Sequence, residues 1–305
     1  MMDLTNSLQK LAGYRPRKTQ KSKETYDKGL ILLKNGGYSR QGDEGWETLE
    51  KLALAALDQG DVEIADQCLQ LIVNKFPNSP RVDVLQGIRM EASEPPEVAL
   101  KFYDELLESD SSNAAVWRRK ASVLRDMGKI DKAVEELSAM LDTFYTDVEG
   151  WIELADIYAS CEQYTYALQS IAHALLLAPQ NTFYFIHYAE IAYLAGDITL
   201  ALKIFLVAVD MTDDDDGPVP PQDSIPVGLT LRAWYGVKLC TRRLITEPRL
   251  VSSSASQTAA PSAAILSNID ELSAERLRTA YMNMKGESAP KAEKELLTAL
   301  AVIIQ

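Results

Sequence analysis

The sequence predicts an all-α protein, a solenoid built from repeated pairs of helices. The first observation behind this prediction is a pattern that recurs after 34 residues between Val116 and Pro179. Its first copy is Trp117, Ala121, Leu124, Ala133 and Leu137, and its second is Trp151, Ala155, Tyr158, Ala167 and Ile171. Small residues suit the places where two helices cross, and large residues fill the space between them.

The second observation is that this period of 34 extends in both directions. Second-helix alanines stand in strict register at Ala65, Ala99, Ala133, Ala167 and Ala201. A small first-helix residue keeps the same phase at Ala53, Gly87, Ala121, Ala155 and Ala189. Five units are indicated, and the period is that of the tetratricopeptide repeat. We therefore expect a right-handed superhelical solenoid with C-terminal capping helices.

Turn and stop residues agree with this phase. Pro77 and Pro179 stand where a second helix must end, because proline lacks the amide donor. Gly60, Gly128 and Gly196 each precede a phased alanine by five residues and can supply a left-handed turn.

Residues 1–45 form a basic arm, with nine Lys or Arg against three acidic residues in the first 40. We expect a solvated leader with a short helix at Thr25–Lys34 that docks through Leu30, Ile31 and Leu33, and glycines up to Gly45 that break it before Trp46. The alternative is electrostatic contact with anionic lipid or an acidic partner.

Five repeats are assigned to residues 46–212, and an acidic, proline-rich inserted loop to 213–228. Gly217 and Ser224 do not fit the spacing of a calcium-binding loop. Residues 229–305 are expected to hold a degenerate sixth repeat beginning with a helix at Leu229–Thr241, a Ser-rich disordered loop at about 250–264, and helices at Ile269–Met284 and Lys291–Ile304.

Composition limits the classes of partner. The net charge of -13 and the pI near 4.7 disfavour nucleic acid, whose phosphates the surface would repel. Three widely spaced cysteines suggest no disulfide framework. The sequence shows neither an apolar run of bilayer length nor the apolar core of a secretory signal near its start. We expect a cytosolic protein.

Catalytic motifs are not apparent. His173 and His187 are the only histidines and have no zinc-ligand spacing around them. The sequence contains no phosphate-binding loop, dinucleotide fingerprint or nucleophile elbow. We expect no catalytic, metal or cofactor site, and no enzyme.

The expected binding surface is the concave groove lined by the first helices. Its candidate partner-binding residues are Arg118, Ser122, Arg125, Ile152, Asp156, Phe183, Ile186, Tyr193, Leu194 and Arg232. The later, apolar part can be explained in two ways: as packing against the sixth unit and the C-terminal helices, or as a groove for a partner segment.

Several blocks resemble the family of subunit 2 of the endoplasmic reticulum membrane protein complex. They are Phe76–Val82, Gly87–Ala92, Asn113–Lys120, Glu149–Ala155, Tyr188–Glu190 and Leu231–Ala233 with Gly236, within roughly residues 46–240. The basic arm, the acidic insertion and the Ser-rich tract depart from the family pattern.

The resemblance implies a non-catalytic scaffold, peripheral on the cytosolic face of the endoplasmic reticulum membrane. Such a subunit supports insertion of tail-anchored and multipass membrane proteins. Its partners would be the cytosolic tails of membrane-embedded subunits and the soluble subunit eight or nine. The alternative function is a chaperone-adaptor that clamps peptide tails with Lys and Arg; the acidic residues of the first helices speak against it.

Overall fold

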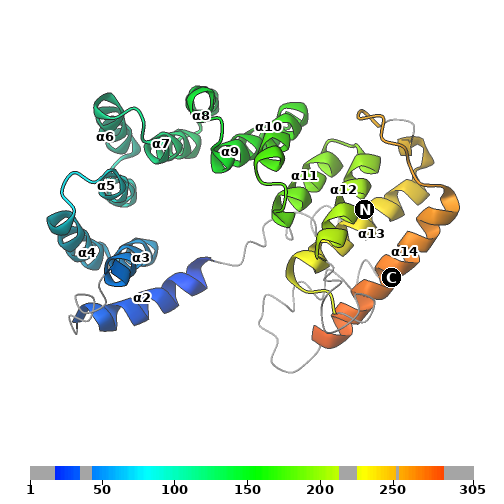
Figure 1. The fold of residues 1–305 in the computed structure, drawn as a ribbon, viewed down its shortest axis with the longest axis horizontal. Helices are drawn as coiled ribbons and strands as arrows, with labels where there is room; N and C mark the ends of the chain where they lie inside the picture. The colour runs from blue at the N-terminus through cyan, green and yellow to red at the C-terminus, as the bar shows by residue number, and fades with distance from the viewer. Residues whose placement is uncertain (1–17, 35–42, 213–224, 252–253, 285–305) are drawn as a thin grey trace. The chain divides into compact units, whose positions relative to one another are not determined.

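A computed structural model describes residues 18–34, 43–212, 225–251 and 254–284, and all regular structure in these ranges is helical. The helices α2 to α8 belong to a first compact unit, residues 1–145, and α9 to α14 to a second, residues 146–305 (Figure 1). The first unit contains α2 (Lys18–Lys34), α3 (Asp43–Gln59), α4 (Val62–Lys75), α5 (Pro80–Ser93), α6 (Pro96–Ser109), α7 (Ala114–Asp126) and α8 (Ile130–Thr143). The second contains α9 (Val148–Ser160), α10 (Tyr164–Leu177), α11 (Thr182–Leu194), α12 (Ile198–Thr212), α13 (Gly228–Thr246), a 3₁₀ turn η2 (Pro248–Val251) and α14 (Ala263–Met284).

Helices that are adjacent in sequence pack as pairs, which confirms the predicted helical-repeat solenoid. The pairs α3/α4, α5/α6, α7/α8, α9/α10 and α11/α12 are the five phased units. All five register alanines, from Ala65 to Ala201, are fully buried. The methyl group of alanine lets two helix backbones approach closely while still removing apolar surface from water.

The small position of the first helix is most restrictive at Gly87. A Cβ atom there would lie 2.2 Å from Cε1 of Tyr103, the buried second-helix residue of the same unit. The first and third units carry leucine where this unit has Tyr103, namely Leu69 and Leu137, and both have alanine at the small position. The tyrosine ring therefore occupies the volume that the glycine leaves.

The predicted glycine turns have the left-handed backbone. Gly60, Gly128 and Gly196 have φ of 79°, 76° and 85°. Glu162 occupies the same place in the fourth unit with φ of 60°, a conformation that costs a residue with a Cβ atom about 1 kcal/mol. The second unit differs, because Glu94 is extended and two prolines follow it.

The N-terminal helix is longer than expected. It begins at Lys18 rather than near Thr25, and the Tyr26 hydroxyl donates to Asp61 Oδ2 at 2.6 Å. Leu30 and Leu33 are half-buried, but Ile31 is exposed, so the docking assigned to Ile31 is wrong. Gly45 lies in the first turn of α3 instead of ending the arm. Residues 1–17 lie outside the described ranges.

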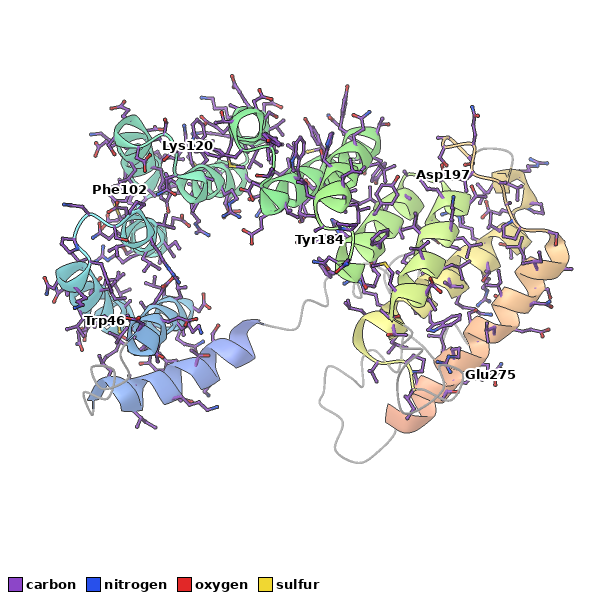
Figure 2. All side chains as sticks on the ribbon, viewed as in Figure 1. Trp46, Phe102, Lys120, Tyr184, Asp197 and Glu275 are labelled. Atoms are coloured by element: carbon purple, nitrogen blue, oxygen red, sulfur yellow. The ribbon has the colours of Figure 1, made fainter. Side chains whose placement is uncertain are left out.

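The Ser-rich tract differs from the expectation of a disordered loop over its described residues 254–262. Buried Asp197 accepts hydrogen bonds from Ser254 Oγ and from the Ser256 backbone N–H, both at 2.9 Å. The same carboxylate accepts from Leu200 N–H and so caps α12 (Figure 2). The polar residues 254–262 are therefore held in place by the hydrogen bonds that Ser254 and Ser256 donate to the buried Asp197 carboxylate.

The C-terminal region also departs from prediction. Helix α13 is longer than Leu229–Thr241, and α14 begins at Ala263, six residues before the expected Ile269. Within α14, Leu272 is exposed. Lys238 Nζ donates to Asp270 Oδ1 at 2.7 Å and joins α13 to α14. The predicted helix Lys291–Ile304 and most of the inserted loop lie outside the described residues.

Gly87→Ala tests the close approach. We expect the free energy of unfolding to fall by about 1 kcal/mol. Overpacking against the Tyr103 ring costs about 2 kcal/mol, and the higher helix propensity of alanine returns about 1 kcal/mol. In a Tyr103→Leu background the same change should be neutral or stabilising. Urea unfolding of the four proteins measures this, and an equal loss in both backgrounds would refute the steric explanation.

Asp197→Asn tests the cap. Burial raises the pKa of Asp197, but hydrogen bonds from Ser256, Leu200 and Ser254 outweigh it and leave the pKa below the ordinary 3.8. A lowered folded-state pKa means that the stabilisation is complete above pH 3.8 and is lost as the pH falls through the lower folded value.

We therefore expect the wild type to lose more stability than Asp197→Asn when the pH falls from about 5 to about 3. At neutral pH the substitution should lower the free energy of unfolding by about 2 kcal/mol. Asp142→Asn, at an exposed position on α8, is the matched control. Thermal unfolding across this pH range measures the stability of each protein. If stability fell equally with pH in wild type and Asp197→Asn, the prediction would be contradicted.

Candidate functional site: a partner-binding surface

The ten candidate residues fall into the two compact units. Arg118, Ser122 and Arg125 lie on α7 in the first unit, and the other seven lie on α9, α11 and α13 in the second. Each unit therefore has its own set of candidate residues.

On α7 the three candidates are half-buried, and the basic residues beside them are neutralised. Arg119 forms a bidentate pair with Glu91, which also accepts a hydrogen bond from the Tyr103 hydroxyl. Burial and this hydrogen bond raise the pKa of Tyr103. Lys120 lies 2.6 Å from Glu136 and 2.9 Å from Asp104 (Figure 2). Arg119 and Lys120 are thus engaged within the unit and do not form an open clamp for a carboxylate.

Helix α9 contributes one core residue and one polar residue. Ile152 packs against the cluster of Ala155, Ala167, Ile171 and Ile191, so part of its side chain stabilises the unit. Asp156 Oδ1 lies 2.8 Å from His187 Nε2 on α11. The His187 ring is nearly parallel to that of Phe183, with centroids 6.3 Å apart.

Helix α11 is apolar on nearly every side, and its residues divide between core and surface. Ile186 is 0% exposed, which removes it from the candidate surface. Phe183 is 37% exposed at the start of the helix and Leu194 is 57% exposed at its end. Tyr193 is half-buried beneath the Arg243 guanidinium, 5.3 Å from its ring, and burial raises the pKa of Tyr193. The packing explanation therefore holds for Ile186 and Tyr193, whereas Phe183 and Leu194 remain accessible.

Arg232 on α13 connects to α11 through charge and aromatic contacts. Its Nε and Nη2 donate to the two carboxylate oxygens of Glu190 at 2.6 and 2.7 Å. Its guanidinium also lies 6.0 Å from the centre of the Phe183 ring. Sequence reasoning missed Glu190 as the partner, because the insertion between α12 and α13 breaks the 34-residue register.

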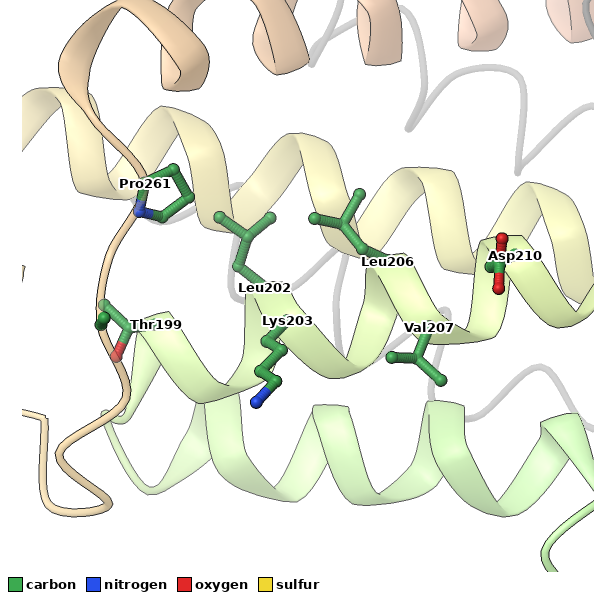
Figure 3. Close-up of a pocket in the computed structure, with 8 residues that line it drawn as sticks. Thr199, Leu202, Lys203, Leu206, Val207, Asp210 and Pro261 are labelled. Carbon is green, nitrogen blue, oxygen red and sulfur yellow. The ribbon is translucent and has the colours of Figure 1, made fainter.

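Two depressions in the second unit were also missed by sequence reasoning. One, of about 770 Å³, is lined by uncharged residues 177–182 and Leu229. The other, of about 400 Å³, follows one side of α12 from Thr199 to Asp210 and is closed at one end by Pro261 (Figure 3). Neither could be found from periodicity, because residues 178–181 connect α10 to α11 and Pro261 belongs to the Ser-rich tract.

Within the described ranges, no group of three or more His, Cys, Asp or Glu side chains is placed to hold a metal ion. None of the described helices combines the length and the apolar character needed to cross a bilayer.

Arg232→Ala tests the connection between α11 and α13. The side chains of this pair are each only 20% exposed, so the orphaned Glu190 carboxylate should cost about 2 kcal/mol. Adding Glu190→Gln should recover part of that loss. Lys51→Ala, which removes an exposed partner of Glu47, should have no measurable effect. Equal unfolding midpoints for Arg232→Ala and wild type would show that the pair contributes nothing.

Comparisons with a family profile and with individual known proteins point to the same family. The profile described as "EMC2 TPR-like repeat domain" matches residues 62–200. "ER membrane protein complex subunit 2-B" of Xenopus laevis is 31% identical over 243 residues, which cover 79% of this chain and 76% of that protein. "TPR repeat protein oca3" of Schizosaccharomyces pombe is 27% identical over 247 residues, covering 79% of this chain and 80% of that protein.

The alignment extends well beyond the repeats that the profile matches, and it covers more than two thirds of both proteins. The predicted resemblance is therefore confirmed. The chain belongs to the family of ER membrane protein complex subunit 2.

Proposed function

We propose that this chain is a non-catalytic scaffold subunit of an endoplasmic reticulum membrane protein complex. It acts on the cytosolic side, where it holds cytosolic segments of membrane-embedded subunits and pairs with the soluble subunit eight or nine. In that position it supports the insertion of tail-anchored and multipass membrane proteins. The observation that carries the proposal is the 31% identity to a subunit 2 protein over 79% of the chain.

The second unit supports this role with a surface of suitable chemistry. Phe183 and Leu194 expose apolar area on a first helix, and the Asp156–His187 and Arg232–Glu190 pairs supply polar groups beside them. Apolar anchors with polar groups alongside are typical of surfaces that hold an extended or helical segment. Association with the membrane is then indirect, through the partners that are held.

The alternative, a chaperone-adaptor that clamps peptide carboxylates, has less support. Such a clamp needs several unneutralised basic side chains along the first helices. Arg119, Lys120 and Arg232 all lie within ion-pair distance of carboxylates of their own unit.

Co-purification tests the proposed surface. Tagged wild-type chain, recovered from detergent-solubilised endoplasmic reticulum membranes, should bring down integral membrane subunits. Phe183→Asp/Leu194→Asp should reduce this recovery roughly tenfold, equivalent to about 1.4 kcal/mol of binding. Val98→Asp/Ile245→Asp is the matched control, because it places two carboxylates at exposed apolar positions elsewhere.

Quantitative mass spectrometry of the recovered proteins provides the measurement. Recovery of no integral membrane proteins by the folded wild type would overturn the scaffold proposal. An equal reduction in both double variants would instead overturn the assignment of the surface to Phe183 and Leu194.

A further inference from the structure

The depression of about 400 Å³ on α12 is a groove between two rows of side chains. Residues four apart on a helix form such rows, and the groove between two rows can accept side chains of a second helix. The rows on α12 are Thr199, Lys203 and Val207, and Leu202, Leu206 and Asp210 (Figure 3). From Thr199 to Asp210 this α12 groove runs for about 16 Å, or three helical turns.

The floor of the α12 groove is apolar, and only one end of it is covered. Thr199 and Leu202 are buried at the end where the chain passes at Pro261. Leu206 and Val207, one turn farther along, are only half-buried. The groove therefore keeps accessible apolar surface over the second half of α12.

The other four second helices do not carry this apolar surface. In the 34-residue register, the positions of Leu206 and Val207 fall on pairs that contain a polar or a small residue. These pairs are Gln70 with Leu71, Asp104 with Glu105, Ser138 with Ala139, and Ala172 with His173. Four units fold without two large apolar side chains at this place, so the repeat itself does not require them on α12.

Two unlike charges stand beside the apolar part of the groove. Lys203 and Asp210 are both exposed, and they are two helical turns apart, about 10 Å along the axis. Within the described part of the chain, neither side chain has an ion-pair or hydrogen-bond partner. The distance between them prevents a mutual ion pair, so both charges can interact with a bound segment.

We propose that the α12 groove binds an amphipathic helix of a partner protein. A row of residues three apart that enters a groove between rows of residues four apart gives a near-parallel crossing, about 20°. The bound helix can therefore follow the groove over its length, with apolar side chains at i, i+3 and i+7 over Leu206 and Val207.

Charge restricts the class of helix that fits. A carboxylate lies beside Lys203 and a cation beside Asp210, so the bound helix carries these two groups about two turns apart. Complementary charges fix the register of a bound segment and disfavour segments with like charges. The groove includes neither Phe183 nor Leu194, and the inference does not rest on the proposed function.

Peptide binding to the full-length chain tests the proposal. The probe is a fluorescein-labelled, alanine-based peptide of about four helical turns, with leucines at i, i+3 and i+7 and a glutamate and a lysine two turns apart beside them. Two further peptides replace that unlike pair by two lysines or by two glutamates. We expect saturable binding in fluorescence anisotropy, with the unlike pair bound roughly fivefold more tightly than either like pair, the upper range for an exposed ion pair.

Single charge changes on the protein should alter this preference. Lys203→Glu should favour the two-lysine peptide, and Asp210→Lys the two-glutamate peptide, each by roughly fivefold. Lys132→Glu and Asp142→Lys on α8 change the net charge equally and should leave the order of affinities as in wild type. All four positions are exposed, so the variants should fold, and their thermal unfolding midpoints check this.

Absence of saturable binding, or equal affinity for the three peptides, would overturn the proposal. An equal change of preference in the α8 controls would do the same, because net charge alone would then explain the binding.

Two measurements test other occupants of the groove. A dimer in sedimentation equilibrium that Val207→Asp dissociates would assign the groove to a second copy of the chain. Protection of Val207→Cys from maleimide, in a Cys161→Ser background that removes the exposed native thiol, would assign it to a segment of the chain itself. Either result would overturn the assignment to a partner helix, whereas a monomer with rapid labelling supports it.

Discussion

The close crossing of paired helices is the constraint on which the rest of this structure depends. Two helix backbones can approach this closely only where a hydrogen atom or a methyl group lies between them, and every unit meets that condition twice. The phased alanines Ala65 to Ala201 meet it on the second helices, and they are all fully buried. The larger side chains around each crossing then have a defined space to fill. Tyr103 above Gly87 shows how a larger residue on one helix requires a smaller one on the other.

Much of the fold could be predicted because each unit is a local structure repeated with a constant period. The alanine register, the glycine turns at Gly60, Gly128 and Gly196, and the pairing of helices all follow from contacts between residues close in sequence. Where the constant period ends, prediction becomes less accurate. The start of α14 and the ordering of residues 254–262 depend on contacts across 30 to 60 residues, such as Lys238 with Asp270 and Asp197 with Ser256.

The candidate surface was predicted less accurately than the fold, and the reason is geometric. Periodicity identifies the helix on which a residue lies, but a side chain at the edge of the packed face can point either way. Ile186 and Leu194 were assigned alike from their positions on α11, yet one is fully buried and the other is mostly accessible. The partners of charged residues were equally hidden. Nothing in the local sequence indicates that Arg232 reaches Glu190, 42 residues earlier, or that Arg119 reaches Glu91.

The attachment of α13 to α12 has a consequence for the length of the chain that connects them. A Cβ atom on Gly236 would lie 2.4 Å from the Phe205 ring, and Asp197 binds the chain beyond α13 through Ser254 and Ser256. The two helices are therefore held by contacts between side chains and backbones of the described residues. Each doubling in length of such a connection costs only about 0.6 kcal/mol of closure entropy. By that measure, a change in the length of the connection between α12 and α13 costs the packed pair little.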